Sequence, residues 1–149
     1  KILLQRVLRA KVEVEEEVIG EIGPGILALV GIEPHDDKAI IERGIEKLLN
    51  YRIFNDESGK MNCSLKEVKG ELLLVSQFTL VANTQKGLRP SFTSAAPPEM
   101  GKNLFQYAVE VAKEYQQQGE LTKVATGEFG ADMQVSLIND GPVTFLLQV

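Results

Sequence analysis

The sequence predicts a single α+β domain in which two main helices accompany about seven or eight strands. Three observations lead to this fold class. Short strand-like runs follow one another with turn residues between them, two longer stretches carry apolar residues at helical spacing, and 149 residues suffice for one sizeable core. Hydrophobic residues make up 44% of the chain and charged residues 25%, as in ordinary globular domains. No linker, repeat or low-complexity segment divides residues 1–149.

The first third of the chain begins with three predicted strands. Residues 1–14 settle into apolar and polar alternation, the pattern of a strand with one wet face. The charged turn 15–17 leads into a hairpin partner over 18–22. After the turn at 23–25, the continuous apolar run 26–32 predicts a central strand.

A helix follows, with Asp36 or Asp37 placed to cap it and Tyr51 near its end. Apolar residues at helical spacing mark its buried face, namely Ile41, Ile45 and Leu48. A short strand is expected at 52–54 and a turn at 55–59.

The most distinctive stretch is the strand predicted over Glu71–Ala82. Its unbroken apolar run, residues 72–75, indicates a strand buried on both faces. Three residues with hydrogen-bonding side chains then crowd together: Ser76, Gln77 and Thr79. A polar group buried without a partner costs about 1–3 kcal/mol, so these side chains must turn to solvent or line a cavity.

Residues 83–98 form the longest segment without periodicity. It holds Lys86, Arg89, Phe92 and three prolines, and loops of this length in compact domains are usually functional or disordered. Phe92 among small residues favours a loop docked on the domain.

The second helix is expected to begin at Pro97 or Pro98 and to end at Gly119. Its apolar face is marked by Leu104, Ala108, Val111 and Tyr115. Three further strands are predicted over 122–126, 133–138 and 143–149.

Several function classes are disfavoured by composition. The net charge of −5 argues against a protein that coats nucleic acid nonspecifically, although a local patch could still hold an RNA end. One histidine, one cysteine and no ligand spacing give poor material for a metal site, and His35 is expected to be a solvated turn residue. The single Cys63 suits a reducing compartment. With no long apolar run and no signal-like start, we expect a cytoplasmic protein that does not enter membranes.

A second unusual stretch is Asn139–Thr144. Asp140-Gly141 between strand-like runs is ordinarily a hairpin turn. Pro142 disturbs that reading, because proline removes a donor from the return strand. The residues alone leave this stretch as an unusual turn.

Together, Ser76–Leu80 and Asn139–Thr144 resemble the paired signature of the D-aminoacyl-tRNA deacylases. The resemblance runs nearly end to end, with further matches at Gln5–Val7, Gly20–Gly23, Arg52–Phe54, Gly59–Asn62, Arg89–Phe92 and Ala131–Met133. Each short match is weak alone, but their common order and spacing make the resemblance specific.

The resemblance implies a homodimeric hydrolase with a barrel-like, mainly antiparallel sheet. It would cleave the ester between a D-amino acid and the 3′-terminal ribose of tRNA, as chiral proofreading in translation, without cofactor or metal and without DNA as a partner. The implied catalytic pocket comprises Ser76, Gln77, Phe78 and Thr79, completed by a cis Gly141-Pro142 of the partner subunit that rejects L-aminoacyl esters. Lys86 and Arg89 are the candidates for tRNA binding. Glu128 stands where the family resemblance leads us to expect an arginine, a departure from the family's pattern.

The residues permit this chemistry without a strong base, because an aminoacyl ester is already reactive and needs positioning and oxyanion support. Thr79 has no base beside it in sequence, so we expect it to position substrate while main-chain amides near Phe78 and Thr79 donate hydrogen bonds. The resemblance points to water as nucleophile, assisted by the tRNA 2′-OH, and we expect glycyl-tRNA to be hydrolysed as well. Two alternatives remain at this point: a noncatalytic module that binds an RNA end or a small ligand, and an ester hydrolase with Thr79 as nucleophile.

Overall fold

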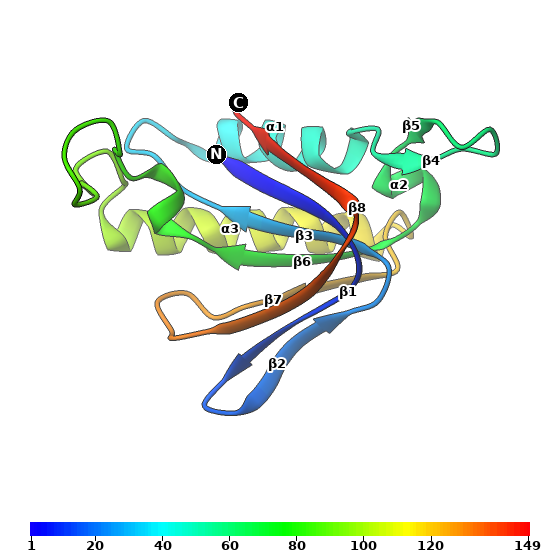
Figure 1. The fold of residues 1–149 in the computed structure, drawn as a ribbon, viewed down its shortest axis with the longest axis horizontal. Helices are drawn as coiled ribbons and strands as arrows, with labels where there is room; N and C mark the ends of the chain where they lie inside the picture. The colour runs from blue at the N-terminus through cyan, green and yellow to red at the C-terminus, as the bar shows by residue number, and fades with distance from the viewer.

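The computed structural model describes all residues, Lys1–Val149. It contains a six-stranded sheet, a separate two-stranded sheet, three α-helices and one 3-10 helix (Figure 1). The elements in chain order are β1 (Ile2–Val14), β2 (Glu17–Ile22), β3 (Gly25–Val30), α1 (Lys38–Asn50), β4 (Phe54–Asn55), β5 (Met61–Cys63), α2 (Leu65–Val68), β6 (Glu71–Ser76), η1 (Phe78–Val81), α3 (Pro98–Gln117), β7 (Lys123–Thr126) and β8 (Gln134–Leu147).

The long strand β1 organises the main sheet. It pairs antiparallel with β8 over nearly its whole length, while its other edge pairs first with β3 and then with β2. The pairs β3–β6 and β6–β7 are parallel, which the sequence did not indicate. The sheet curls until β2 meets β7, where a Cβ on Gly20 would lie 2.5 Å from the carbonyl oxygen of Thr126. The result is a nearly closed, barrel-like α+β domain, as expected.

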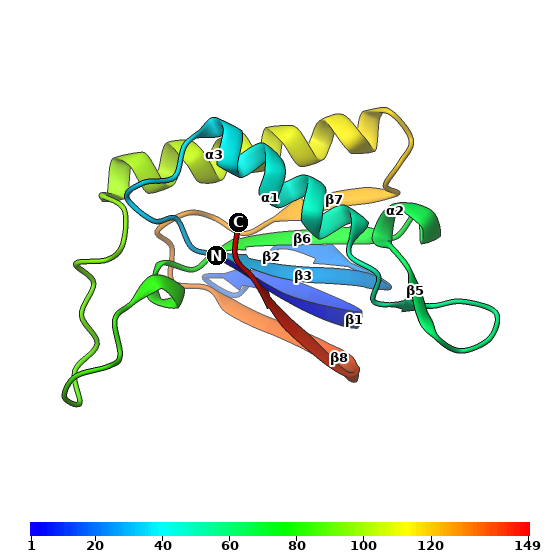
Figure 2. The ribbon, with the colours of Figure 1, turned by 90° about the horizontal axis from the view of Figure 1, so that it is seen from above.

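Two apolar cores lie on the two faces of β3 and β6. The larger core lies between the sheet and the helices α1 and α3, which cover one face (Figure 2). The smaller core fills the inside of the curled sheet and includes Leu27, Leu73 and Val75. Successive residues of a strand point to opposite faces, so residues 72–75 are all buried, and the predicted burial on both faces is confirmed.

The two predicted helices begin and end close to the capping residues identified in the sequence. Asp37 caps α1, accepting a hydrogen bond from the Ile40 main-chain N–H at 2.9 Å. Proline opens α3, and Gly119 follows its end with φ +80°. The short helix α2 was not predicted; a reciprocal capping box between Ser64 and Glu67 begins it. None of the helices combines the length and the apolar character needed to span a bilayer.

Three predicted strand boundaries were wrong. The strand expected over Glu71–Ala82 ends at Ser76, and the chain turns into η1. The strand expected at 52–54 is only the two-residue β4. The strands expected over 133–138 and 143–149 are one continuous strand, β8, so the hairpin turn at Asp140-Gly141 does not exist.

Candidate active site

The carboxyl end of β6 is where the buried strand gives way to polar side chains. Ser76 stands opposite Val30 in the parallel pair β3–β6, and the Gln77 main-chain N–H still donates to the Val30 carbonyl oxygen at 2.8 Å. The backbone then bends at Gln77, and η1 begins with Phe78. The apolar run therefore delivers three polar or aromatic side chains to one edge of the sheet.

A cavity of about 590 Å³ opens at this edge. β3, β6, the loop before α3, the first turns of α3 and the segment after β7 build its walls, which are mostly apolar. Its lining includes Val30, Ile32, Val75, Ser76, Gln77, Phe78, Phe92, Ala95, Ala96, Gly101, Phe105, Phe129 and Met133. A few polar groups in an apolar cavity are the usual composition of a small-ligand site.

An aromatic pair stands at the exposed side of the cavity. The rings of Phe78 and Phe92 are tilted by 54° with centroids 5.1 Å apart. They remain 60% and 42% exposed, unusual for phenylalanine in a domain with two well-filled cores. Their free faces offer a stacking surface to a planar ligand.

Thr79 lies next to the cavity without lining it. Its hydroxyl accepts a hydrogen bond from the Gln77 side-chain amide. No histidine or carboxylate contacts this hydroxyl, so nothing is placed to take its proton. The side chains of Gln77 and Thr79 are thus hydrogen-bonded to each other beside the cavity.

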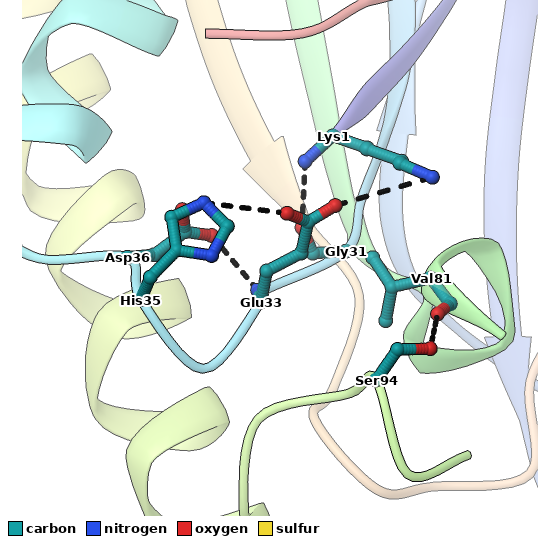
Figure 3. A network of polar contacts seen from close by, with 7 residues as sticks. All are labelled: Lys1, Gly31, Glu33, His35, Asp36, Val81 and Ser94. Carbon is teal, nitrogen blue, oxygen red and sulfur yellow. Dashed lines mark hydrogen bonds and ion pairs between the residues drawn. The ribbon is translucent and has the colours of Figure 1, made fainter. Parts of the chain in front are cut away.

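The loop that carries Phe92 is fastened to the domain at two points. The Ser94 hydroxyl donates to the Val81 carbonyl oxygen at 2.7 Å (Figure 3). The Ala96 main-chain N–H donates to the Ile32 carbonyl oxygen at 3.0 Å. The part of the loop from residue 92 to residue 96 is therefore docked, as Phe92 led us to expect, and it forms one wall of the cavity.

The adjoining loop between β3 and α1 holds the only histidine. The Asp36 carboxylate accepts from the Glu33 main-chain N–H at 2.8 Å, and the His35 Nε2 lies 3.4 Å from Glu33 Oε2 (Figure 3). His35 is exposed in a turn and lines a different cavity, of about 400 Å³, beside α1. It does not reach the residues at the end of β6.

Gly141 and Pro142 lie away from their own chain's cavity, exposed on β8. The peptide bond between them is cis. Asn139 is paired with Val7 and Thr144 with Gln5, so residues 140–143 oppose the single residue Arg6 and form a bulge.

This bulge is held from two sides. Arg6 Nε donates to the Asp140 carbonyl oxygen at 3.2 Å, and the Asn139 side-chain oxygen accepts from the Val143 main-chain N–H at 3.0 Å. Gly141 has φ +135°, and a Cβ there would lie 2.7 Å from Val143 Cγ2, so only glycine fits. The bulge presents a fixed Gly141-Pro142 at the surface.

The two basic residues singled out in the sequence, Lys86 and Arg89, lie on the exposed part of the loop that ends at Phe92. Neither forms an ion pair with an acidic side chain of the chain. Both charges are thus free to meet an anionic partner beside the cavity.

The groups with shifted pKa values lie away from the cavity. A hydrogen bond from the Asn62 side chain, with others from the main chain of Lys60 and Ser58, lowers the pKa of Asp56. A hydrogen bond to Glu42 raises the pKa of Tyr107. No group of three or more His, Cys, Asp and Glu side chains is placed to hold a metal ion.

Sequence reasoning missed most of the cavity wall. Ile32, Phe105, Phe129 and Met133 look like core residues in the sequence, because an apolar cavity and an apolar core use the same side chains. One signal was available at Phe92, an aromatic residue in a proline-rich loop. Gly101 has no such signal, since its closeness to Phe129 appears only in three dimensions.

The comparisons with known proteins agree over the whole chain. A family model described as D-Tyr-tRNA(Tyr) deacylase matches residues 3–148. A D-aminoacyl-tRNA deacylase of Ectopseudomonas mendocina is 62% identical over 149 residues, covering 100% of this chain and 99% of the relative. One of Pseudomonas aeruginosa (strain UCBPP-PA14) is 59% identical, covering 99% of each chain.

Two solved structures share the fold. One, titled c-Myc DNA Unwinding Element Binding Protein, superposes with a TM-score of 0.91 at 41% identity, covering 99% of this chain and 97% of its own. The other, described as a probable eukaryotic D-amino acid tRNA deacylase, has a TM-score of 0.88 at 16% identity, covering 99% and 98%, and supports the fold alone.

Proposed function

The chain belongs to the D-Tyr-tRNA(Tyr) deacylase family, and we propose that it hydrolyses the ester between a D-amino acid and the 3′-terminal ribose of tRNA. The products are the free D-amino acid and tRNA, and the reaction removes mischarged tRNAs before translation in the cytoplasm. The observation that carries the proposal is the cavity at the end of β6. Ser76, Gln77 and Phe78 line it, and Phe78 packs on Phe92 at its exposed side.

The cavity suits the terminal nucleoside of a charged tRNA. A base stacked on an aromatic side chain contributes about 1–3 kcal/mol, and the free faces of Phe78 and Phe92 supply that surface. The ester then lies beside Ser76 and Gln77 at the strand end. Gln77 orients the substrate, and its bond to Thr79 limits the rotamers that it samples.

Water is the nucleophile in this scheme, assisted by the 2′-OH of the substrate ribose. An aminoacyl ester is reactive enough that positioning and oxyanion stabilisation supply most of the acceleration. The main-chain N–H groups of Phe78 and Thr79 begin η1, and the first N–H groups of a helix have no acceptor within it. They are the donors that we assign to the oxyanion. The scheme does not use Thr79 as the nucleophile, because its hydroxyl contacts Gln77 and no base.

A second copy of the chain completes each site in our proposal. β8 pairs only with β1, so its other edge is free over 14 residues. Exposed apolar side chains gather on these two strands, namely Leu8, Ile138, Phe145 and Leu146. A long free edge with exposed apolar groups is a surface that proteins normally cover. A homodimer would cover it and carry Gly141-Pro142 of one subunit to the cavity of the other.

Lys86 and Arg89 are the proposed contacts to the tRNA backbone. The chain's net charge of −5 opposes general attraction to RNA, so binding depends on such a local patch. Glu128 adds a negative charge at a position where the family resemblance led us to expect a positive one. We therefore expect the affinity for tRNA to depend strongly on Lys86 and Arg89.

The proposal is tested by incubating purified protein with D-tyrosyl-tRNA and, in parallel, L-tyrosyl-tRNA. We expect rapid release of D-tyrosine and sparing of the L-ester. Tight binding of tRNA with no release of either amino acid would identify a noncatalytic RNA-end module instead. A trapped acyl-enzyme at Thr79 would identify the nucleophilic hydrolase.

A further inference from the structure

The loop between η1 and α3 contains a protruding segment whose base is closed by main-chain hydrogen bonds. The Asn83 N–H donates to the Ser91 carbonyl oxygen at 2.8 Å, and the Ser91 N–H returns a bond to the Asn83 carbonyl oxygen at 3.1 Å. The Gln85 N–H also donates to the Asn83 side chain at 3.0 Å. Residues 84–90, here called the finger, project beyond this closed base and away from the body of the domain (Figure 2).

Leu88 is displayed on this finger without any cover. It is 103% exposed, whereas the next most exposed large apolar residue, Phe78, is 60% exposed. Gly87 precedes it with φ +71°, a conformation that favours glycine and turns the chain at this point. A side chain this exposed buries almost no apolar surface within the domain, so Leu88 is free to contact another molecule.

The finger and the cavity share one surface. Phe92 follows the base of the finger directly and packs on Phe78 at the side of the cavity. Lys86 and Arg89 flank Leu88 on either side in the chain. A ligand whose end fills the cavity and which extends along this surface therefore meets two cations and one aliphatic group.

We propose that Leu88 packs against the open face of the last base pair of the tRNA acceptor stem, with Lys86 and Arg89 on the adjoining phosphates. This inference rests on the proposed function. The end of a stacked duplex is a broad apolar face, and inserted leucine side chains are a known way for proteins to contact stacked bases. A cation on each side of such a residue suits the two strands that flank that face.

The dimensions agree with this placement. A chain advances about 3.3 Å per residue when extended, so a finger that protrudes by about three residues reaches about 10 Å beyond its base. A stacked nucleotide strand advances about 3.4 Å per nucleotide. The few unpaired nucleotides at the 3′ end of a tRNA therefore span a similar distance, from the cavity to the stem end.

The test compares Leu88→Ser with Met61→Ser, an exposed apolar residue on β5 at the opposite end of the molecule (Figure 2). Two substrates are used, a D-aminoacyl-tRNA and the same D-amino acid esterified to adenosine, which has no stem. We expect Leu88→Ser to raise KM for the tRNA about tenfold, with kcat unchanged, and to leave the adenosine ester unaffected. Met61→Ser should match wild type on both substrates.

The salt dependence separates Leu88 from its charged neighbours. Because Leu88 displaces no counterion, Leu88→Ser should keep the wild-type slope of log KM against log salt, whereas reversing Lys86 and Arg89 should flatten it. An added 5′ nucleotide stacked on the stem end should raise the wild-type KM to that of Leu88→Ser and should not change KM for the variant.

An unchanged KM of Leu88→Ser on tRNA would overturn the proposal, and so would an equal rise on the adenosine ester, which would show an effect on the cavity itself. If wild type hydrolyses neither ester, the proposed function is wrong. The Leu88 contact is then tested by measuring the affinity for tRNA. Uncharged tRNA must then bind Leu88→Ser about tenfold more weakly than wild type, and equal affinity rejects the contact.

Discussion

Arg6 and Asp140 are joined twice across the β1–β8 pair. The Arg6 Nε donates to the Asp140 carbonyl oxygen at 3.2 Å and lies 3.5 Å from the carboxylate oxygen Oδ2. Another arm of the same guanidinium, Nη1, donates to the Ile53 carbonyl oxygen at 2.7 Å. Arg6 thus ties the bulge that presents Gly141 to the segment that follows α1.

Replacing Arg6 with alanine should weaken both the fold and the selectivity. Its side chain is only 12% exposed, and two carbonyl groups would lose their donor, so we expect a loss of about 1–3 kcal/mol in the free energy of unfolding. A looser bulge should also lower the ratio of D-ester to L-ester hydrolysis, by roughly tenfold or 1.4 kcal/mol. Denaturant unfolding and paired deacylation assays measure the two effects. Arg43→Ala, at an exposed position of α1, is the control and should change neither.

The proposed sharing of each site between two subunits predicts complementation between two inactive variants. Phe78→Asp damages the cavity, while Gly141→Val damages the element supplied to the partner, because a side chain at φ +135° is strained and would collide with Val143. Each variant dimer should be inactive or unselective. Each mixed dimer should regain one working site. In that site, the intact cavity of the Gly141→Val subunit receives the intact Gly141-Pro142 of the Phe78→Asp subunit.

Sedimentation at micromolar concentration is the companion measurement for this dimer. Wild type should sediment as a dimer, with the activity in that species. An active monomer, or mixing that restores nothing although mixed dimers form, would contradict a site shared between subunits.

The sequence predicted the local patterns better than the places where chain segments meet. Residues 72–75 lie between two cores, so the side chains on both faces of the strand are apolar, and this unbroken apolar run is visible in the sequence. The bend after Ser76 was missed, since Thr79, Leu80 and Val81 would also suit a strand. The continuity of β8 was missed because it depends on Arg6, which is 134 residues from Asp140 in sequence.

Two substitutions at Thr79 separate its side chain from its main chain. Thr79→Ala removes a hydroxyl that only Gln77 contacts, so we expect activity to remain substantial. Thr79→Pro removes the main-chain N–H that we assign to the oxyanion, and losing one such donor costs about 10²–10³ in kcat. Single-turnover rates with saturating enzyme measure both variants. Complete loss of turnover in a folded Thr79→Ala dimer that still binds substrate would restore Thr79 as the nucleophile.

The turn between β4 and β5 should give a pH-dependent contribution to stability through Asp56. Its carboxylate accepts from the Ser58 N–H at 2.8 Å, the Lys60 N–H at 3.0 Å and the Asn62 side chain at 2.9 Å. These bonds lower the folded-state pKa of Asp56 below the ordinary 3.8. The stabilisation is therefore fully present above about pH 4–5 and is lost as pH falls through the folded-state pKa.

Unfolding free energies of wild type and Asp56→Ala, measured against pH, should differ by a constant amount near neutrality and converge below pH 3.8. Glu57→Ala, at the exposed neighbouring position, is the control and should show no such convergence. A difference that stays constant to the lowest pH would mean that the turn does not depend on the Asp56 charge.

The last prediction concerns which amino acids are removed, and it follows from how a cavity distinguishes mirror images. D- and L-aminoacyl esters carry the same groups, so fixing the amine and the carbonyl leaves only hydrogen and side chain exchanged at Cα. In the proposed dimer, the partner's Gly141-Pro142 fills the space of an L side chain, and Arg6 and Asn139 brace the bulge that holds it. Rejection by such a wall works through a clash and needs no recognition of the D side chain.

Glycine has no side chain on either face, so a wall of this kind cannot exclude it. We therefore expect hydrolysis of many D-aminoacyl-tRNAs, measurable hydrolysis of glycyl-tRNA, and sparing of L-aminoacyl-tRNAs down to L-alanyl. Deacylation rates of glycyl, D-alanyl and L-alanyl esters of one tRNA provide the comparison, since the RNA contacts are then identical. Arg6→Ala gives a second check, because a loosened wall should raise the L-alanyl rate while leaving the glycyl rate nearly unchanged. If the glycyl ester proved as inert as the L-alanyl ester, the cavity would have to recognise the D side chain directly, and exclusion by the partner's Gly141-Pro142 would be wrong.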